Sequence, residues 1–290
     1  MEETRRVVGD SMIGLRMPDH QRHTPRVATV LGHNPGPFTG PGTNTYLVGT
    51  GRSPILLDTG QGVPVYSEKL KSALGEHCAD GEVSRIVLTH AHADHIGGVK
   101  QVRALFGDVE VLKKPWPGKD DQGEPLTIID DNSIVTGEGV TLRAVFTPGH
   151  APDHLCYYLE EERALFTGDV VLGAGTTVIS DESGNLVEYM NSLRRLLELD
   201  LRTIYPAHGP VINEPHRKIR EYIAHRELRE RQILGVLAGG PRAVDEIVRE
   251  IYTDVPTHLH AAAAMSVRSH LKKLRAEGRV EENGTHWSAT

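Results

Sequence analysis

Residues 89–98 read Thr89-His90-Ala91-His92-Ala93-Asp94-His95-Ile96-Gly97-Gly98, and they directly follow the apolar run Ile86-Val87-Leu88. Neutral imidazole and carboxylate are ligands that Zn²⁺ prefers, and ordinary packing does not satisfy four of them in so short a stretch. Leaving a strand, His90 and His92 alternate to one side, whereas Asp94 and His95 turn toward a neighbouring position as the next helix begins. The stretch therefore predicts a loop that serves two adjacent metal positions.

Three further candidate ligands stand where later apolar runs end, each close to a glycine that lets the backbone turn tightly. They are His150 in Thr147-Pro148-Gly149-His150, Asp169 in Phe166-Thr167-Gly168-Asp169, and His208 in Tyr205-Pro206-Ala207-His208-Gly209. We predict two zinc ions per chain: one on His90, His92 and His150, the other on Asp94, His95 and His208, with Asp169 between them. Water held between two zinc ions is deprotonated near neutral pH and would be the nucleophile, with Asp94 orienting it.

The order of apolar patterns predicts an α/β protein. Short apolar runs that end in Gly, Pro, Asp or His are typical of buried strands leading into functional loops, and they occur at 45–48, 55–58, 86–90, 144–148 and 164–169. Helical spacing lies between them, over 66–74, 99–105 and 186–197. This alternation favours helices outside stacked sheets, although periodicity alone also allows a doubly wound sheet.

The chain divides into three regions. Residues 1–26 carry charges and prolines without periodicity and are interpreted as a mobile lead-in with at most a short helix, and 27–213 form the predicted catalytic domain. In 214–290 the composition changes to a long helix after Pro215, a break at Gly239-Gly240-Pro241, shorter helices near 243–252 and 258–277, and a terminal hairpin. This region is either a small winged-helix module or a plain helical cap.

Composition restricts the class of protein. No stretch reaches the roughly 18 to 20 apolar residues of a membrane span, and no apolar signal segment follows the N-terminal charges, so we expect no membrane partner. Cys78 and Cys156 form no CxxC pair and suit a reducing compartment, which we expect to be the cytoplasm. The net charge is −7, but residues 215–290 carry 13 Lys and Arg against 10 Asp and Glu, which is weak evidence for a nucleic-acid partner beside an ordinary solvated surface.

Five segments in this order resemble the metallo-β-lactamase superfamily over about residues 30–212: LLDTG, HAHADH, TPGH, FTGD and PAHG, of which HAHADH matches the HxHxDH signature. The resemblance implies an αββα sandwich of two mixed sheets with helices outside and the metal site at one edge. It also implies that Asp58 supports the metal-binding loop. The alternative for Asp58 is a polar turn residue after a strand.

A narrower resemblance extends from about 27 to 287. The segments His33–Pro37, Gly42–Val48, Ala151–His154, Glu188–Leu193 and Ser269–Leu274 are similar to the beta-lactamase-like protein 2 family, zinc endoribonucleases that act on single-stranded RNA. Ala91 stands where that family has a larger aromatic residue, and His33 and Pro41 also depart from its pattern. We expect metal binding to survive these differences and substrate preference to differ. Because the family is mitochondrial in animals, the resemblance also gives the mitochondrial matrix as the alternative to the cytoplasm.

Four side chains outside the metal motifs are candidates for contact with a substrate. His154 would be catalytic by donating to an oxyanion or phosphate, unless it is a packed histidine. Thr43 and Asn44, in a loop flanked by glycine, would line the pocket, unless they only form the turn. Tyr189 would reach the site from a helix, with core packing as its alternative.

The tail helix predicted over 267–279 carries a basic stripe. Arg268, Lys272, Arg275 and Arg279 follow at i, i+4, i+7 and i+11, beside an apolar stripe of Val267, Leu271 and Leu274. Basic side chains along one ridge suit contacts with phosphates. An ordinary solvated helix surface is the alternative.

A zinc pair hydrolyses phosphodiesters, thioesters and lactams with one nucleophile, so the surroundings decide the substrate. We predict an endoribonuclease acting on single-stranded RNA. A thioester hydrolase is the alternative, because glyoxalase II and the polyketide-releasing thioesterases share the metal motifs and the GTNTYLVG-like segment. A β-lactamase is disfavoured because no signal peptide is present and zinc β-lactamases lack the bridging aspartate. A binding module on an inactive scaffold would not retain seven ligands.

Overall fold

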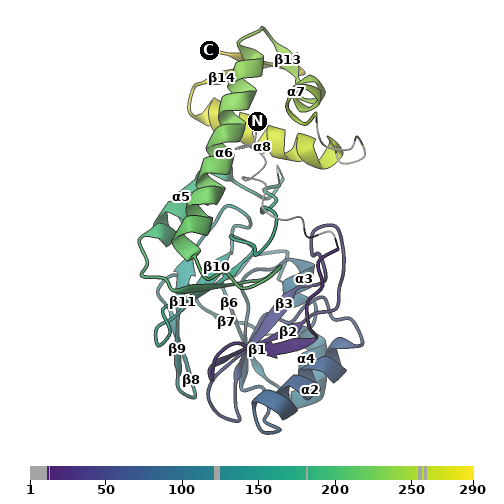
Figure 1. The fold of residues 1–290 in the computed structure, drawn as a ribbon, viewed down its shortest axis with the longest axis vertical. Helices are drawn as coiled ribbons and strands as arrows, with labels where there is room; N and C mark the ends of the chain where they lie inside the picture. Colours follow the sequence, from purple (N-terminus) through teal and green to yellow (C-terminus); the bar gives the residue numbers. More distant parts are fainter. Residues whose placement is uncertain (1–11, 13, 121–124, 181, 254–256, 258–259) are drawn as a thin grey trace. The chain divides into compact units, whose positions relative to one another are not determined.

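Two β-sheets form the framework of the first of two compact units, which comprises Met1–Thr147, Asp153–Thr176 and Leu199–Lys218 (Figure 1). The computed structural model describes residues 12, 14–120, 125–180, 182–253, 257 and 260–290. In this described part the first sheet has the order β1 (His20–Arg22), β2 (Val27–Leu31), β3 (Asn44–Val48), β4 (Ile55–Leu57), β5 (Arg85–Val87), β6 (Glu110–Lys113), β7 (Thr127–Ile128). The second has the order β12 (Thr203–Pro206), β11 (Ala164–Gly168), β10 (Leu155–Leu159), β9 (Val140–Phe146), β8 (Ile134–Gly137).

Strand direction brings the candidate ligands to common edges. β4, β5, β6 and β7 run parallel, with Leu57 opposite Val87, so the segments after β4 and β5 leave the first sheet at one edge. β11 and β12 are also parallel, with Gly168 opposite Pro206, so Asp169 and His208 leave the second sheet side by side. The remaining neighbours within these two sheets pair antiparallel.

Apolar side chains from both sheets share one core, so the two sheets pack face to face. Tyr46 of β3 meets Phe166 of β11 edge-on, with ring centroids 5.0 Å apart, and Tyr205 of β12 stacks on Phe166 at 5.1 Å. A second core joins the other face of the first sheet to α2 (Tyr66–His77) and α4 (Val99–Phe106). This arrangement decides between the two α/β architectures that periodicity left open: the first unit is a sandwich with helices outside its first sheet.

The N-terminal region differs from its interpretation as a lead-in without regular structure. His20–Arg22 forms β1, an edge strand whose residues pair antiparallel with Ala28–Val30 of β2. Its side chains are half-buried or exposed, so no apolar alternation announces the strand. The predicted strand through His90 is also shorter, because β5 ends at Val87 and the metal-binding loop begins there. A predicted helix before residue 12 lies outside the described residues.

The second unit comprises Pro148–Pro152, Thr177–Glu198 and Ile219–Thr290. Its elements in the described residues are α5 (Leu186–Leu197), most of α6 (Pro215–Leu237), α7 (Val244–Ile251), α8 (His260–Ala276) and the sheet β13 (Arg242–Ala243), β15 (His286–Ala289), β14 (Val280–Asn283). Ile233, Ile247, Leu271, Val280 and Trp287 share one apolar core. The helix, turn, helix and hairpin predicted for the tail are confirmed. Within the described residues, no helix combines the length and apolar character needed to cross a membrane.

A buried polar cluster joins α6 to α8 within the second unit. Lys273 Nζ lies 2.9 Å from Glu230 Oε1, and His270 Nδ1 lies 3.6 Å from the same oxygen. Burial, opposed by the Glu230 carboxylate, lowers the pKa of His270 to about 4. An unfolded histidine titrates near 6.5, so the unfolded chain binds the extra proton between these values.

We therefore expect the second unit to lose stability as the pH falls from 7 to 5. His270 alone contributes a loss of about 2 kcal/mol in the free energy of unfolding, since only the unfolded state is protonated in this window. The loss stops growing below about pH 4, where His270 also titrates in the folded state. Urea unfolding followed by Trp287 fluorescence in a Trp116→Phe background measures it. His270→Gln should remove the contribution of His270, whereas His225 of α6, whose pKa burial also lowers to about 4, should keep its own. An equal loss in both proteins would contradict the assignment to His270.

Candidate metal centre

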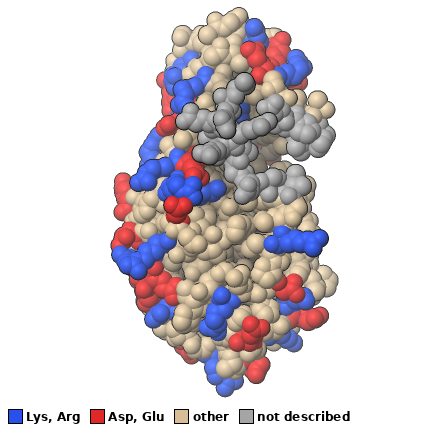
Figure 2. Space-filling model, in the orientation of Figure 1, with Lys and Arg blue, Asp and Glu red and all other residues tan. Residues whose placement is uncertain are grey.

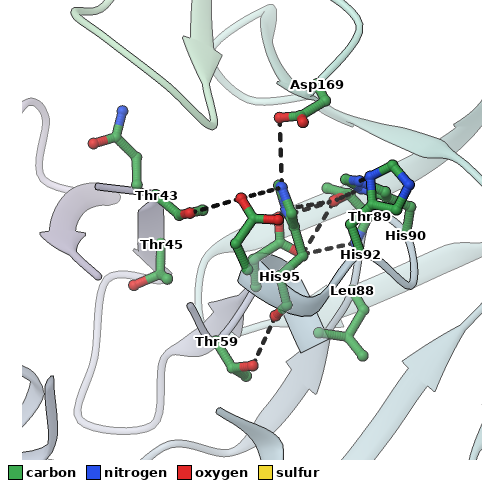
Figure 3. A network of polar contacts seen from close by, with 12 residues as sticks. Thr43, Thr45, Thr59, Leu88, Thr89, His90, His92, His95 and Asp169 are labelled. Carbon is green, nitrogen blue, oxygen red and sulfur yellow. Dashed lines mark hydrogen bonds and ion pairs between the residues drawn. The ribbon is translucent and has the colours of Figure 1, made fainter. Parts of the chain in front are cut away.

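The segments that follow β4, β5, β11 and β12 place their polar side chains around one point of the first unit (Figure 3). Asp94, His95 and His208 each offer a ligand atom within 4.8 Å of the others. Ligand atoms of His90, His92 and Asp169 lie within the same distance of one another. The structure thus divides the ligands of this unit into the two predicted groups.

His95 is fixed by a carboxylate on one side and points at two others. Its Nδ1 lies 2.8 Å from Asp58 Oδ2. The opposite nitrogen, Nε2, is 3.4 Å from both Asp94 Oδ2 and Asp169 Oδ1, and it is buried without a hydrogen bond in the described structure. A ring held at Nδ1 presents Nε2 as a metal ligand.

His208 completes this group from the second sheet. Its Nε2 lies 3.3 Å from Asp94 Oδ2 and 3.1 Å from Asp169 Oδ1. These separations match the edge of about 3.3 Å expected between tetrahedral ligands 2.0–2.1 Å from a zinc ion. The residues therefore fit a divalent metal ion. Asp169 is grouped with His90 and His92 and also lies beside His95 and His208, so it links the two groups.

The other group is built on the loop after β5. His90 Nε2 lies 2.9 Å from His92 Nδ1, and His90 Nδ1 lies 3.0 Å from Thr89 Oγ1. Burial, reinforced by the neighbouring His95 and His92, holds the pKa of His90 well below its usual range. His90 is therefore a neutral imidazole near pH 7, which is the form that binds a metal ion.

Charges within the Asp94 group are strongly coupled. Burial favours the neutral form of His208, but Asp169 and Asp94 outweigh it and raise the pKa of His208 to about 9. Burial likewise opposes ionisation of Asp94 and Asp169, yet His95 and His208 lower the pKa of both carboxyls. The carboxylates stay ionised and the imidazoles hold protons that a divalent cation would displace.

His150, the remaining predicted ligand, belongs to the second unit. It lies on the loop Pro148–Pro152, and both residues that flank this loop, Thr147 and Asp153, belong to the first unit. Its Nδ1 donates to the carbonyl oxygen of Val178 at 2.9 Å. That hydrogen bond selects Nε2 as the metal-binding nitrogen, so the tautomer suits the predicted role, which stays a prediction.

Asp58 supports the metal-binding loop at two points. Its Oδ1 accepts the backbone N–H of Thr89 at 2.8 Å, and its Oδ2 accepts from Thr89 Oγ1 at 2.9 Å as well as facing His95. Asp58 adopts a left-handed backbone with φ of 59° and is fully buried. The sequence did not indicate this role for Thr89, although the residue stands directly before the first ligand, His90.

Thr43 and Asn44 hold ligands rather than a substrate, which corrects the prediction that they line the pocket. Thr43 is fully buried, and its hydroxyl donates to Asp94 Oδ2 at 3.0 Å (Figure 3). Asn44 Nδ2 donates to the carbonyl oxygens of Pro206 and Gly209, both at 2.9 Å. These hydrogen bonds stabilise the turn that carries His208.

His154 is also a positioning residue, and the prediction that it donates a proton to the substrate is wrong. It is fully buried, and its Nε2 accepts the backbone N–H of Asp169 at 3.2 Å while Nδ1 faces Thr147 Oγ1 at 3.0 Å. A nitrogen that accepts this hydrogen bond has no proton to give. The tight approach requires Gly168, because a Cβ there would lie 2.5 Å from His154 Nε2.

Tyr189 is packed inside the second unit, so its assignment as a substrate contact is corrected to the core alternative. Its side chain is fully buried, and the Arg226 guanidinium lies 5.4 Å from the ring centroid. A Cβ at Gly149 would come within 2.2 Å of the Tyr189 backbone nitrogen, so the helix also fixes the loop of His150.

Three residues of the predicted basic stripe lie on α8, whereas Arg279 lies beyond it, because the helix ends at Ala276 rather than continuing to 279. Lys272, Arg275 and Arg279 are exposed, and Arg268 is half-buried. Trp116 was missed by the sequence reasoning: its ring centroid lies 6.0 Å from that of His92. Only its setting between Pro115 and Pro117 in a loop could have drawn attention to it.

Comparison with known proteins agrees with this geometry. The model of the metallo-beta-lactamase superfamily matches residues 38–208, and that of the beta-lactamase associated winged helix domain matches 243–287. The chain is 43% identical over 259 residues to the Beta-lactamase-like protein 2 homolog of Caenorhabditis elegans, covering 88% of this chain and 86% of the relative. It is also 43% identical over 249 residues to the Atrochrysone carboxyl ACP thioesterase of Aspergillus chevalieri, covering 83% and 77%.

A solved structure shares the fold. The crystal structure of a Beta-lactamase domain protein from Burkholderia ambifaria aligns with a TM-score of 0.82 over 96% of each chain, at 20% identity. The mixed α/β fold with a C-terminal winged helix is thereby confirmed. Motifs, fold and relatives lead to one conclusion: the chain belongs to the metallo-beta-lactamase superfamily of hydrolases.

Proposed function

We propose that the protein is a dinuclear zinc endoribonuclease that cleaves single-stranded RNA. The observation that carries the proposal is the row of basic side chains on α8. Arg268, Lys272 and Arg275 line a cavity of about 360 Å³ on the second unit, together with Trp287. A row of separate cations suits a ligand with repeated phosphates better than a ligand with a single charge.

The charge around this cavity is mixed. Asp245 and Glu282 also line it, and Arg275 pairs with Glu282. Figure 2 shows acidic and basic side chains close together on the visible face of the second unit. The proposal therefore rests on particular cations rather than on a uniformly basic surface.

The side chains of the metal centre would carry out the hydrolysis. Two bound divalent ions would supply an activated water and polarise the phosphorus centre. Thr43 holds Asp94, Asn44 holds the turn of His208, and Asp58 holds His95, so the ligands are oriented before a metal arrives. Such fixed ligands reduce the reorganisation needed during the reaction.

The relatives support two substrate classes. The identity to the Beta-lactamase-like protein 2 homolog of Caenorhabditis elegans extends over most of both chains, and the nuclease is the activity that the resemblance to that family implies. A second candidate is an acyl thioester hydrolase, which the equal identity to the Aspergillus chevalieri thioesterase favours. Both substrates suit the same metal centre, so the preference for RNA in this proposal rests on the α8 cations.

Removing two of these cations should change the salt dependence of RNA cleavage. For Lys272→Ala/Arg275→Ala we expect the slope of log kcat/KM against log salt to flatten by about 1.4, since each phosphate contact on a single strand contributes roughly 0.7. The matched control is Arg220→Ala/Arg231→Ala, which removes two exposed charges from α6. A labelled single-stranded RNA resolved on denaturing gels between 50 and 200 mM salt gives the rates.

An acyl thioester panel run beside the RNA tests the second candidate. Rapid thioester hydrolysis with intact RNA would refute the nuclease and identify a thioesterase. Equal slopes in the two double variants would refute the role of α8 even if RNA is cleaved.

A further inference from the structure

A second group of metal-binding side chains lies away from the metal centre, where β1 and the C-terminal end of α2 lie side by side (Figure 1). His20 lies on β1, and Glu76 and His77 are the last two residues of α2. One ligand atom from each residue lies within 4.8 Å of the other two. The three side chains belong to the first unit, and the fold brings them together from two distant parts of the sequence.

The two imidazoles have the spacing of metal ligands. His20 Nδ1 lies 3.1 Å from His77 Nε2, close to the edge of about 3.3 Å expected between tetrahedral zinc ligands. Glu76 Oε2 lies 3.9 Å from His20 Nδ1, so a rotation of this carboxylate would bring it to the same point.

A neighbouring hydroxyl orients His20 for this role. His20 Nε2 lies 3.3 Å from Ser72 Oγ, and in the tautomer that donates to this hydroxyl the lone pair is on Nδ1. Metal-binding histidines characteristically donate their second ring N–H to such a partner. Ser72 thus supports His20 as Asp58 supports His95, by contact with the ring nitrogen that does not face the metal position.

Burial and the helix also favour a cation here. The His77 side chain is 5% exposed and that of His20 is 16% exposed, whereas the Glu76 side chain is 66% exposed. Two largely buried imidazoles and one exposed carboxylate would leave the fourth position to water. The C-terminal end of a helix carries partial negative charge, which attracts cations. The nearby Arg22 donates to the backbone carbonyl oxygen of His77, so this hydrogen bond does not occupy a ring nitrogen of His77.

We propose that His20, Glu76 and His77 form a separate site for a divalent transition metal such as Zn²⁺, which binds β1 to α2. The alternative is a simple hydrogen bond between His20 and His77. It explains the contact between the two imidazoles but not the position of Glu76 beside them. Two histidines, one glutamate and a water match the donors and coordination number that zinc takes in proteins. The site is independent of the proposed function, because it shares no residue with the metal centre.

The zinc content of matched variants tests the site. Wild-type protein, Glu76→Gln, His20→Gln and Glu68→Gln would be dialysed against the same buffered zinc, and bound zinc per chain measured. Glu68 is an exposed carboxylate in the first turn of α2, and among the described residues it belongs to none of the groups that could hold a metal ion, so it provides the same charge change as a control. We expect Glu76→Gln and His20→Gln to bind one zinc fewer than wild type and Glu68→Gln, with unchanged hydrolytic rates.

A histidine ring spectrum supplies a second readout. Zinc added beyond the content of the metal centre should shift the ring resonances of His20 and His77 in Glu68→Gln, and no longer do so in Glu76→Gln. Equal zinc content in all four proteins, or unshifted His20 and His77 resonances, would overturn the proposal. Loss of zinc from the metal centre would instead remove the hydrolytic activity, so the two failures can be told apart.

Discussion

Asp169→Ala is expected to lower hydrolysis by more than the roughly 10- to 100-fold that follows loss of a residue behind a metal ligand. The reason is its position: Asp169 Oδ1 lies 3.1 Å from His208 Nε2 and 3.4 Å from His95 Nε2, while the same carboxylate also groups with His90 and His92. Without it, both groups of ligands lose a negative charge, and His95 and His208 are left close together. Metal content and the rate on single-stranded RNA and thioesters should fall together.

Asp58→Asn provides the comparison, because it removes a charge that contacts His95 without contacting a metal. The asparagine can still accept from Thr89, so we expect a loss within the 10- to 100-fold range. Circular dichroism shows that both variants are folded. If Asp169→Ala kept its metal and its rate, the assignment of Asp169 as the shared carboxylate would be wrong.

Lys113→Met is expected to destabilise the first unit by about 3–5 kcal/mol, the range for removing one partner of a buried ion pair. Lys113 is fully buried, and its Nζ lies 2.5 Å from both Asp120 Oδ1 and Asp153 Oδ2. Burial raises the pKa of Asp153 even with this cation beside it. Without Lys113, folding would bury Asp153 with no compensating charge. Urea unfolding followed by Trp116 fluorescence in a Trp287→Phe background reports on this unit.

The next residue along the chain supplies the control. Lys114 pairs with the exposed Asp130 at 2.7 Å, so Lys114→Met should cost less than about 1 kcal/mol. Lys113→Met/Asp153→Leu should recover part of the stability, since the orphaned carboxylate is gone. A small effect of Lys113→Met, similar to that of Lys114→Met, would show that Asp153 is neutral or hydrated in the folded protein.

The sequence identified the His and Asp side chains that the structure groups at the candidate metal centre, because ligand chemistry is local. Four ligands between residues 90 and 95 follow one strand, and His150, Asp169 and His208 each stand in a recognisable turn. The strands and helices were predictable for a similar reason: burial on both faces of β3, β10 and β11 leaves continuous apolar runs.

The residues behind the ligands were misassigned because their partners are remote in the sequence. Thr43 and Asp94 are 51 residues apart in the sequence, and Asn44 and Pro206 are 162 residues apart. A polar residue near a pocket motif has the same pattern whether it faces the substrate or a ligand, and only the fold decides. β1 was missed because an edge strand with polar side chains is stabilised by backbone pairing, which leaves no mark on the sequence.

The left-handed backbone of Asp58 has a consequence for how this protein can change. A residue with a Cβ in that conformation costs on the order of 1 kcal/mol, which glycine would avoid. Glycine, however, has no carboxylate for Thr89 and His95. The Thr89 N–H and the His95 ring would lose a buried partner at a cost of about 1–3 kcal/mol, which exceeds the strain that glycine relieves. Selection for thermal stability and selection for turnover therefore both favour aspartate at this strained position.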